Sequence, residues 1–154
     1  MNKSKIQKKS QNSRVSCTLD LAFETSLSHL PNLSRILEAL LKMRELHENL
    51  AYEIITVINE IVSNSIQHAY LKKPDNIIRI SISMDESAFT LVLFEENPLV
   101  HKDMIELTSI NEFQESGGET GFGMALIHKY MDEVRRESIE NGYKWTLRRS
   151  LTQD

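Results

Sequence analysis

The chain lacks the features that hold many proteins together covalently or fix them to a membrane. Among its 154 residues there is one cysteine, Cys17, so no disulfide can form within the chain, and we expect an inert strand residue in a cytoplasmic protein. No apolar run approaches the roughly 18 residues that a membrane span requires. The N-terminus lacks the apolar core of a signal peptide. These absences favour a single domain that depends on its own hydrophobic core.

Positive charge is scarce outside the first fourteen residues. That segment carries five Lys and Arg and no acid, whereas the rest of the chain carries thirteen bases and twenty-two acids. Because the segment has no aromatic residue, we interpret residues 1–14 as a disordered, solubilising tail rather than a nucleic-acid-binding arm. The acidic body argues against direct nucleic-acid binding. A phosphate ligand would therefore have to be held by backbone amides and a metal.

The hydrophobic pattern changes between the two-residue period of strands and the spacing of helices. Alternation or apolar runs predict strands, the third of them suited to burial on both faces, over 15–23, 76–84, 88–96, 134–139 and 143–149. Helical spacing predicts one helix beginning after Ser28 or His29, one over about 50–70, and one within 121–134. This order predicts an α+β two-layer sandwich: a mostly antiparallel, mixed sheet with helices on one face.

Residues 97–122 form an unusually long connection for a compact domain. They are polar and hold three of the five glycines, with a short helix predicted near 102–110. Connections of this length are more often functional loops or lids than simple linkers.

Three polar residues in "NEIVSNSIQHAY", residues 59–70, are spaced four apart on the second predicted helix. At about 100° per residue, Glu60, Asn64 and His68 fall at about 0°, 40° and 80°, on the border of the apolar face. One interpretation is an ordinary amphipathic helix with Glu60 and Asn64 solvated. The other is the wall of a pocket, where an Asn oxygen suits Mg²⁺ and a Glu one turn earlier can take a proton from a nucleophile.

Glycines cluster before the last predicted helix, in "ESGGETGFGMALIHKYMDEV". Gly117, Gly118, Gly121 and Gly123 let backbone amides approach a ligand, and a helix N-terminus suits phosphate. Thr120 adds a hydroxyl donor or a cap. A flexible loop before a helix explains the same pattern. The segment is not a P-loop, because no Gly-Lys-Ser/Thr follows, and no dinucleotide-binding glycine motif follows the first strand.

The combination of these motifs resembles the Bergerat-fold (GHKL-type) ATPases. Within them it is most similar to the bacterial anti-sigma factor serine/threonine kinases, over roughly residues 15–150. The resemblance implies ATP and Mg²⁺ as cofactors, Asn64 as the metal ligand that bridges the phosphates, and Glu60 as the general base for a seryl hydroxyl. It also implies that phosphate is held by amides around Thr120, Gly121, Phe122 and Gly123.

The adenine-binding position departs from the family pattern. The resemblance places an Asp-x-Gly turn after the central strand, where this chain has "EEN", Glu95 to Asn97. Glu95 can still accept the hydrogen bond of the adenine amino group but is one methylene longer. Asn97 must replace glycine, and Asn tolerates left-handed backbone better than most residues.

The resemblance further implies two protein partners, an anti-sigma factor antagonist as substrate and a sigma factor to be sequestered, with a homodimer as the assembly. Two alternatives remain. The first is a non-catalytic partner-binding module on the same fold, favoured by the altered turn. The second is a histidine kinase catalytic domain, prompted by "HEN" at His47 to Asn49, although His47 is otherwise read as an exposed residue between helices.

Overall fold

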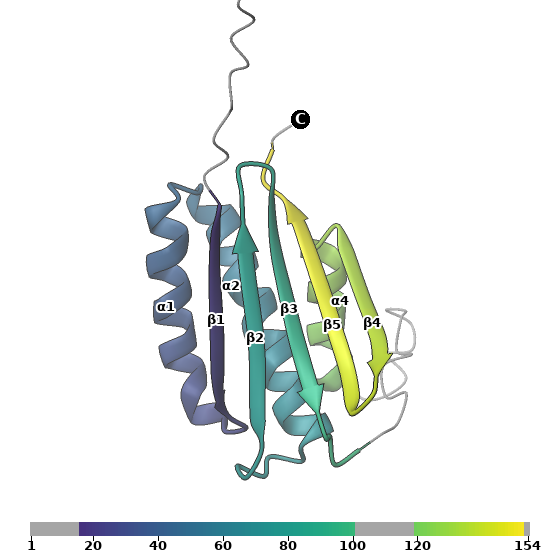
Figure 1. Cartoon of the computed structure of the whole chain (residues 1–154). Coiled ribbons are helices and arrows are strands. Elements are labelled where there is room, and N and C mark those ends of the chain that lie inside the picture. Colours follow the sequence, from purple (N-terminus) through teal and green to yellow (C-terminus); the bar gives the residue numbers. More distant parts are fainter. Residues whose placement is uncertain (1–15, 101–118, 153–154) are drawn as a thin grey trace, which may run out of the picture.

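The computed structural model describes residues 16–100 and 119–152, in which helices cover one face of a five-stranded sheet (Figure 1). The strands are β1 (Cys17–Glu24), β2 (Ile77–Met84), β3 (Ala88–Glu96), β4 (Glu133–Ile139) and β5 (Gly142–Ser150), and the helices are α1 (Leu30–Met43), α2 (Glu48–Asn64) and α4 (Glu119–Tyr130). The spatial order is β1-β2-β3-β5-β4. The predicted α+β sandwich is confirmed. Every pairing between the described strands is antiparallel, in agreement with the prediction of a mostly antiparallel sheet, and no parallel pair occurs among them.

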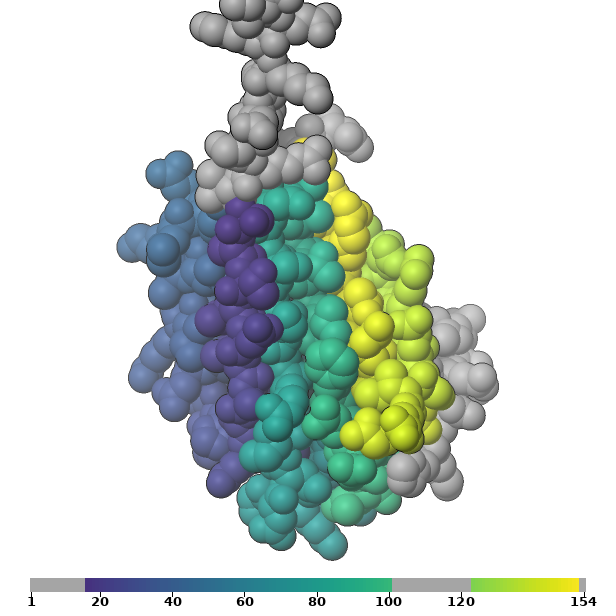
Figure 2. Space-filling view, in the orientation of Figure 1, coloured from purple at the N-terminus to yellow at the C-terminus, as the bar shows by residue number. Residues whose placement is uncertain are grey.

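The strands present one apolar face to the helices. In β2, Ile78, Ile80, Ile82 and Met84 are buried, while the residues between them are exposed or half-buried. β3 follows the same alternation, so our expectation of a strand buried on both faces is wrong. Its second face is only half-buried because the described helices all lie on the other side. Figure 2 shows the strands side by side on that uncovered face.

The first helix forms because its leucines recur at helical spacing behind Pro31, which lies in the first turn. Leu33, Leu37 and Leu41 are buried against the rest of the core. The exposed His47 lies between the helices as expected, and its Nδ1 accepts a hydrogen bond from the Asn49 N–H at 3.3 Å. His47 is therefore the N-cap of α2.

The second helix continues from α2 into a π-helical segment, Ser65–Ala69, so helical backbone runs to the predicted end. Leu71 and Lys72 then adopt left-handed φ angles of 54° and 59°, before Pro74. A π-helical segment changes the register of the side chains that follow, and such segments are common at functional sites.

The β4–β5 hairpin places β5 between β3 and β4. At its turn, a Cβ on Gly142 would overlap the carbonyl oxygen of Glu95, so the close approach of the two strands requires glycine. None of the described helices is long and apolar enough to cross a membrane. The predicted tail and short helix near 102–110, and most of the predicted lid, lie outside the described residues.

Candidate functional site

Glu60 and Asn64 lie on the side of α2 that faces α4. A Cβ on Gly123 would overlap Glu60 Oε2, and it would lie 3.3 Å from Glu60 Cδ and 3.4 Å from Asn64 Nδ2. Three residues singled out in separate sequence motifs are therefore brought together. Glu60 and Asn64 are half-buried against a second helix, unlike the fully solvated side chains of the amphipathic-helix interpretation.

The glycine at position 123 permits this approach because it carries no side chain. The helix predicted within 121–134 begins two residues earlier, at Glu119, so Gly121 and Gly123 lie inside α4 and do not precede it. Thr120 and Gly121 lie in the first turn, where backbone N–H groups have no intrahelical partner. The amide role predicted for residues 120–123 therefore suits these two better than Phe122 or Gly123. The contribution of Gly123 in the structure is the space it leaves for Glu60.

His68 lies in the π-helical segment and is half-buried. It follows the turn at Ser65, where the helical register changes. We assign His68 no chemical role.

Ser65 is a site residue that the sequence analysis missed. It is almost completely buried, with 1% of its surface exposed, and its hydroxyl donates a hydrogen bond to Glu95 Oε1 at 2.7 Å. On the same helical wheel Ser65 falls at about 140°, within the apolar arc. A polar residue in the middle of an apolar face was the signal that could have identified it, because buried hydroxyls need a partner.

Glu95 is buried at the end of β3 with its side chain on the helix-covered face. Only 3% of the surface of Glu95 is exposed to solvent. Besides the bond from Ser65, its Oε2 lies 4.0 Å from Nη2 of Arg136 on β4. Burial of a carboxylate is costly unless it is paired and hydrogen-bonded, and these two partners supply both.

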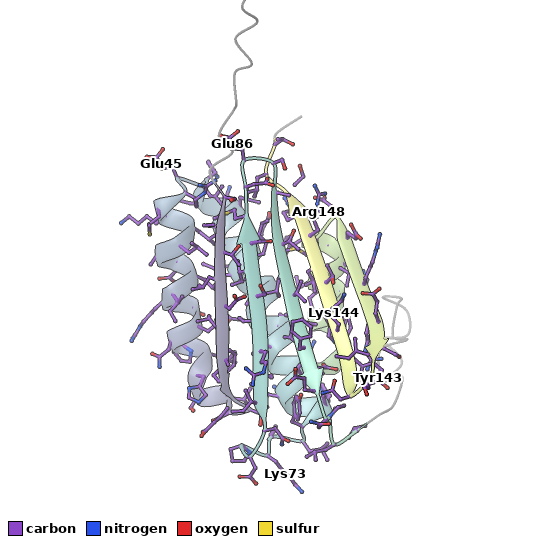
Figure 3. All side chains as sticks on the ribbon, in the orientation of Figure 1. Glu45, Lys73, Glu86, Tyr143, Lys144 and Arg148 are labelled. Atoms are coloured by element: carbon purple, nitrogen blue, oxygen red, sulfur yellow. The ribbon has the colours of Figure 1, made fainter. Side chains whose placement is uncertain are left out.

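Arg136 is held by aromatic residues of β5. Its Cζ lies 3.7 Å from the ring centroid of Tyr143 and 5.6 Å from that of Trp145. The strand register pairs Tyr143 with Glu95 and Trp145 with Arg136, which puts all four side chains on one face. Figure 3 labels Tyr143 near the start of β5, and the register pairs it with Glu95 at the end of β3. No sequence pattern singled out Arg136 or Tyr143.

Asn97 adopts the left-handed conformation that replacement of glycine requires, with φ of 49°. Its N–H donates to the carbonyl oxygen of Asn141 at 2.6 Å, which ties the turn after β3 to the β4–β5 turn. Asn97 lines a cavity of about 490 Å³ together with Pro98 and residues 138–143. The turn is therefore compatible with the altered "EEN" sequence.

Tyr70 supports the same end of β3 from the helix layer. Its hydroxyl donates to the carbonyl oxygen of Glu96 at 2.8 Å. Burial raises the pKa of the Tyr70 phenol well above its ordinary value, and the carboxylates of Glu95 and Glu96 add to the rise. Tyr70 therefore stays a neutral hydrogen-bond donor.

Comparison with known proteins gives a consistent result. The sequence profile described as "Histidine kinase-like ATPase domain" matches residues 23–148. The chain is 26% identical to the Anti-sigma F factor of Clostridium novyi (strain NT) over 100 residues, 64% of this chain and 70% of the relative. It is 33% identical to the Anti-sigma F factor of Halalkalibacterium halodurans over 88 residues, 54% of this chain and 57% of the relative.

Among solved structures, the chain is similar in fold to one in the SiaB–SiaC complex from Pseudomonas aeruginosa. The TM-score is 0.56 at 16% identity, and the alignment covers 86% of this chain and 89% of the other. At this identity the likeness supports the fold alone.

Proposed function

Since the chain belongs to the family of histidine kinase-like ATPase domains, we propose that it is an ATP-dependent protein serine kinase that acts as an anti-sigma factor. The observation that supports this most is the close approach of Gly123 to Glu60 and Asn64. It joins an acidic side chain, an amide side chain and the N-terminal part of a helix at one place. A serine kinase needs this set: a proton acceptor, an oxygen ligand for a metal, and amides for phosphate.

The residues at this place suit Mg²⁺ and a triphosphate. No group of three or more His, Cys, Asp or Glu that could hold a metal occurs in residues 16–100 and 119–152. Mg²⁺ accepts one or two protein ligands when phosphates and water complete its coordination. Asn64 would supply the protein oxygen, and amides in the first turn of α4 would hold phosphate. When bound, the metal would neutralise charge on the phosphates.

Glu60 is the residue we propose for proton transfer. Its carboxylate is half-buried beside α4, one helical turn before Asn64. In this role it would accept the proton of a seryl hydroxyl as that oxygen attacks. Rigid placement on α2 fixes the carboxylate relative to Asn64, and such positioning supplies much of the catalysis in phosphoryl transfer.

The proposed substrate is an anti-sigma factor antagonist, and the second partner is a sigma factor sequestered by the chain. The relatives named as anti-sigma F factors support this choice. The proposal places the chain in the cytoplasm, where transcription takes place, and includes a homodimer. Light scattering after gel filtration measures the assembly.

A second candidate is a partner-binding module on the same fold without catalysis. It is favoured by Glu95, the proposed adenine contact, because Ser65 and Arg136 already engage its carboxylate. Such a module would bind its partners without any dependence on nucleotide.

The test is phosphorylation of purified antagonist proteins encoded near the gene, with Mg-ATP and a phosphoserine readout. We expect Glu60→Gln to lower the rate by about 10²- to 10⁴-fold while nucleotide binding is retained. Glu48→Gln, a matched change at an exposed position in the first turn of α2, should leave the rate unchanged. Unchanged phosphorylation by Glu60→Gln would remove Glu60 from the mechanism. Absence of phosphorylation of every candidate by the unaltered chain would favour the non-catalytic module.

A further inference from the structure

Arg136 covers the side of the Glu95 carboxylate that Ser65 leaves free. Ser65 binds Oε1 at 2.7 Å from the helix layer, and Arg136 Nη2 approaches Oε2 at 4.0 Å from the sheet. The Glu95 side chain is only 4% exposed in this arrangement. A ligand that donates a hydrogen bond to Glu95 therefore has no free approach to the carboxylate while both partners remain in place.

The two partners differ in how readily they can move. Ser65 is fixed by a helical backbone and is 1% exposed. Arg136 has a long side chain that is 18% exposed, and it lies on β4, an edge strand of the described sheet. Of the two partners that cover the Glu95 carboxylate, the guanidinium is therefore the one that can move away.

Space beside Tyr143, the ring that the guanidinium contacts, makes such a movement feasible. Tyr143, on which Arg136 stacks, also lines the cavity of about 490 Å³, together with Ser138 of β4. The stack holds the guanidinium beside Glu95 by a cation–π contact, which is stronger where the pair is shielded from water. The ring therefore both retains the closed arrangement and borders the space into which the guanidinium can move.

We propose that Arg136 closes the base end of the nucleotide site and sets its affinity: a nucleotide base reaches Glu95 only by displacing the guanidinium. This rests on the proposed function, in which Glu95 accepts from the base amino group. The cost of the displacement lowers nucleotide affinity. Arg136 is a specificity-determining residue in this account, because only a base that replaces its favourable contact with Glu95 is retained.

The experiment compares Arg136→Ser with Arg135→Ser. Both remove an arginine from β4, but Arg135 is ion-paired with Glu133 at 2.5 Å and its side chain is 67% exposed. The register places it opposite Thr146, on the uncovered face. Titration calorimetry with Mg-ATP and Mg-ADP measures affinity. We expect Arg136→Ser to bind about tenfold more tightly than Arg135→Ser, which corresponds to loss of an ion pair that binding otherwise has to break.

A second readout follows the guanidinium itself. Trp145 is the one tryptophan of the chain and lies beside Arg136. Its fluorescence should change when nucleotide binds to the unaltered chain, and this change should be lost in Arg136→Ser. If Arg136→Ser melts before it can be titrated, Tyr143→Leu decides, since it keeps the charge but removes the ring on which the guanidinium stacks. We expect it to bind about threefold more tightly than the unaltered chain.

The outcomes separate this proposal from the proposed function. Equal or weaker binding by the Arg136 variant, with nucleotide binding intact in the unaltered chain, overturns the role of Arg136 alone. If Arg136→Ser binds nucleotide and the unaltered chain does not, the role of Arg136 is supported and the proposed kinase activity of the unaltered chain is contradicted. No binding by either chain overturns both proposals.

Discussion

The two ends of the candidate site differ in how the chain treats its own polar groups. Between α2 and α4, Glu60 and Asn64 are half-buried beside a glycine that leaves space for them. At the end of β3, Glu95 is buried and already partnered by a serine and an arginine. The first end is shaped by what is missing, a side chain at position 123. The second is shaped by what is present. In the proposed function, the end between α2 and α4 would hold the phosphates and is open to a ligand, whereas Glu95 at the other end would first have to lose a partner.

After Glu60→Gln, Gly123→Ala should have the largest effect, and it should damage only the first end. The new Cβ overlaps Glu60 Oε2, the tip of a flexible side chain, so Glu60 should rotate away while the fold stays intact. Misplacement of a catalytic group by about 1 Å can cost about 10²-fold in rate, and we expect a loss of that size. Phosphorylation kinetics measure it.

Ala125→Gly is the control for helix propensity in α4. It should lower the free energy of unfolding by about 1 kcal/mol or less without moving Glu60. A Gly123→Ala variant with the normal rate would contradict the role given to this contact.

Ser65→Ala should lower the stability of the fold by removing a hydrogen bond at the second end, the one to Glu95. Loss of a hydrogen bond to a buried carboxylate should lower the free energy of unfolding by about 1.5–3 kcal/mol. Ser63→Ala is the matched control, because Ser63 is only half-buried and its hydroxyl accepts from the Gln67 side chain. Denaturation in urea compares the two. Equal losses of unfolding free energy in the two variants would mean that the hydrogen bond from Ser65 to Glu95 stabilises the fold no more than an ordinary surface contact.

Tyr70→Phe, at the same end, should remove one source of the pH dependence of the free energy of unfolding. The pKa of Tyr70 is raised in the folded chain above its ordinary value of 10.0, so its contribution is fully present below about pH 10 and is lost as pH rises above it. Between pH 8 and pH 11 the unaltered chain should lose about 1 kcal/mol more stability than Tyr70→Phe. Tyr52→Phe, at a tyrosine that is 68% exposed, should behave like the unaltered chain. Parallel pH profiles for both variants would contradict the assignment.

Asn97→Gly should have the smallest effect. The left-handed φ of Asn97 costs asparagine little, so glycine should change the free energy of unfolding by no more than about 0.5 kcal/mol. Asn97→Val should cost about 1–2 kcal/mol, because a β-branched side chain is strained there. Thermal denaturation distinguishes the two substitutions. A large loss with glycine would point to a contact of the Asn97 side chain.

Sequence patterns predicted most of the helices and strands, because the pattern of each element depends on residues close together along the chain. Alternation identified β2, and leucine spacing identified α1, since one face of each element must be buried. The wheel likewise identified Glu60 and Asn64. The start of α4 was misjudged because glycine disfavours helices locally, and the packing of Gly123 against Glu60 outweighs that preference.

The base end was only partly predictable because its contacts join distant strands. Glu95 was identified from its place after the central strand. Its partner Arg136 depends on β5 lying between β3 and β4, an order that no local pattern specifies. Tyr143 became visible as a neighbour of Glu95 only through the strand register.

Calorimetry with Asn64→Ala tests whether the α2–α4 end holds the phosphates of Mg-ATP. Asn59→Ala is the matched control, an asparagine on the same helix whose side chain bonds Ser34 of α1. We predict that Asn64→Ala loses magnesium-dependent ATP affinity by at least about tenfold while Asn59→Ala keeps it. Equal affinities in the two variants would contradict the account.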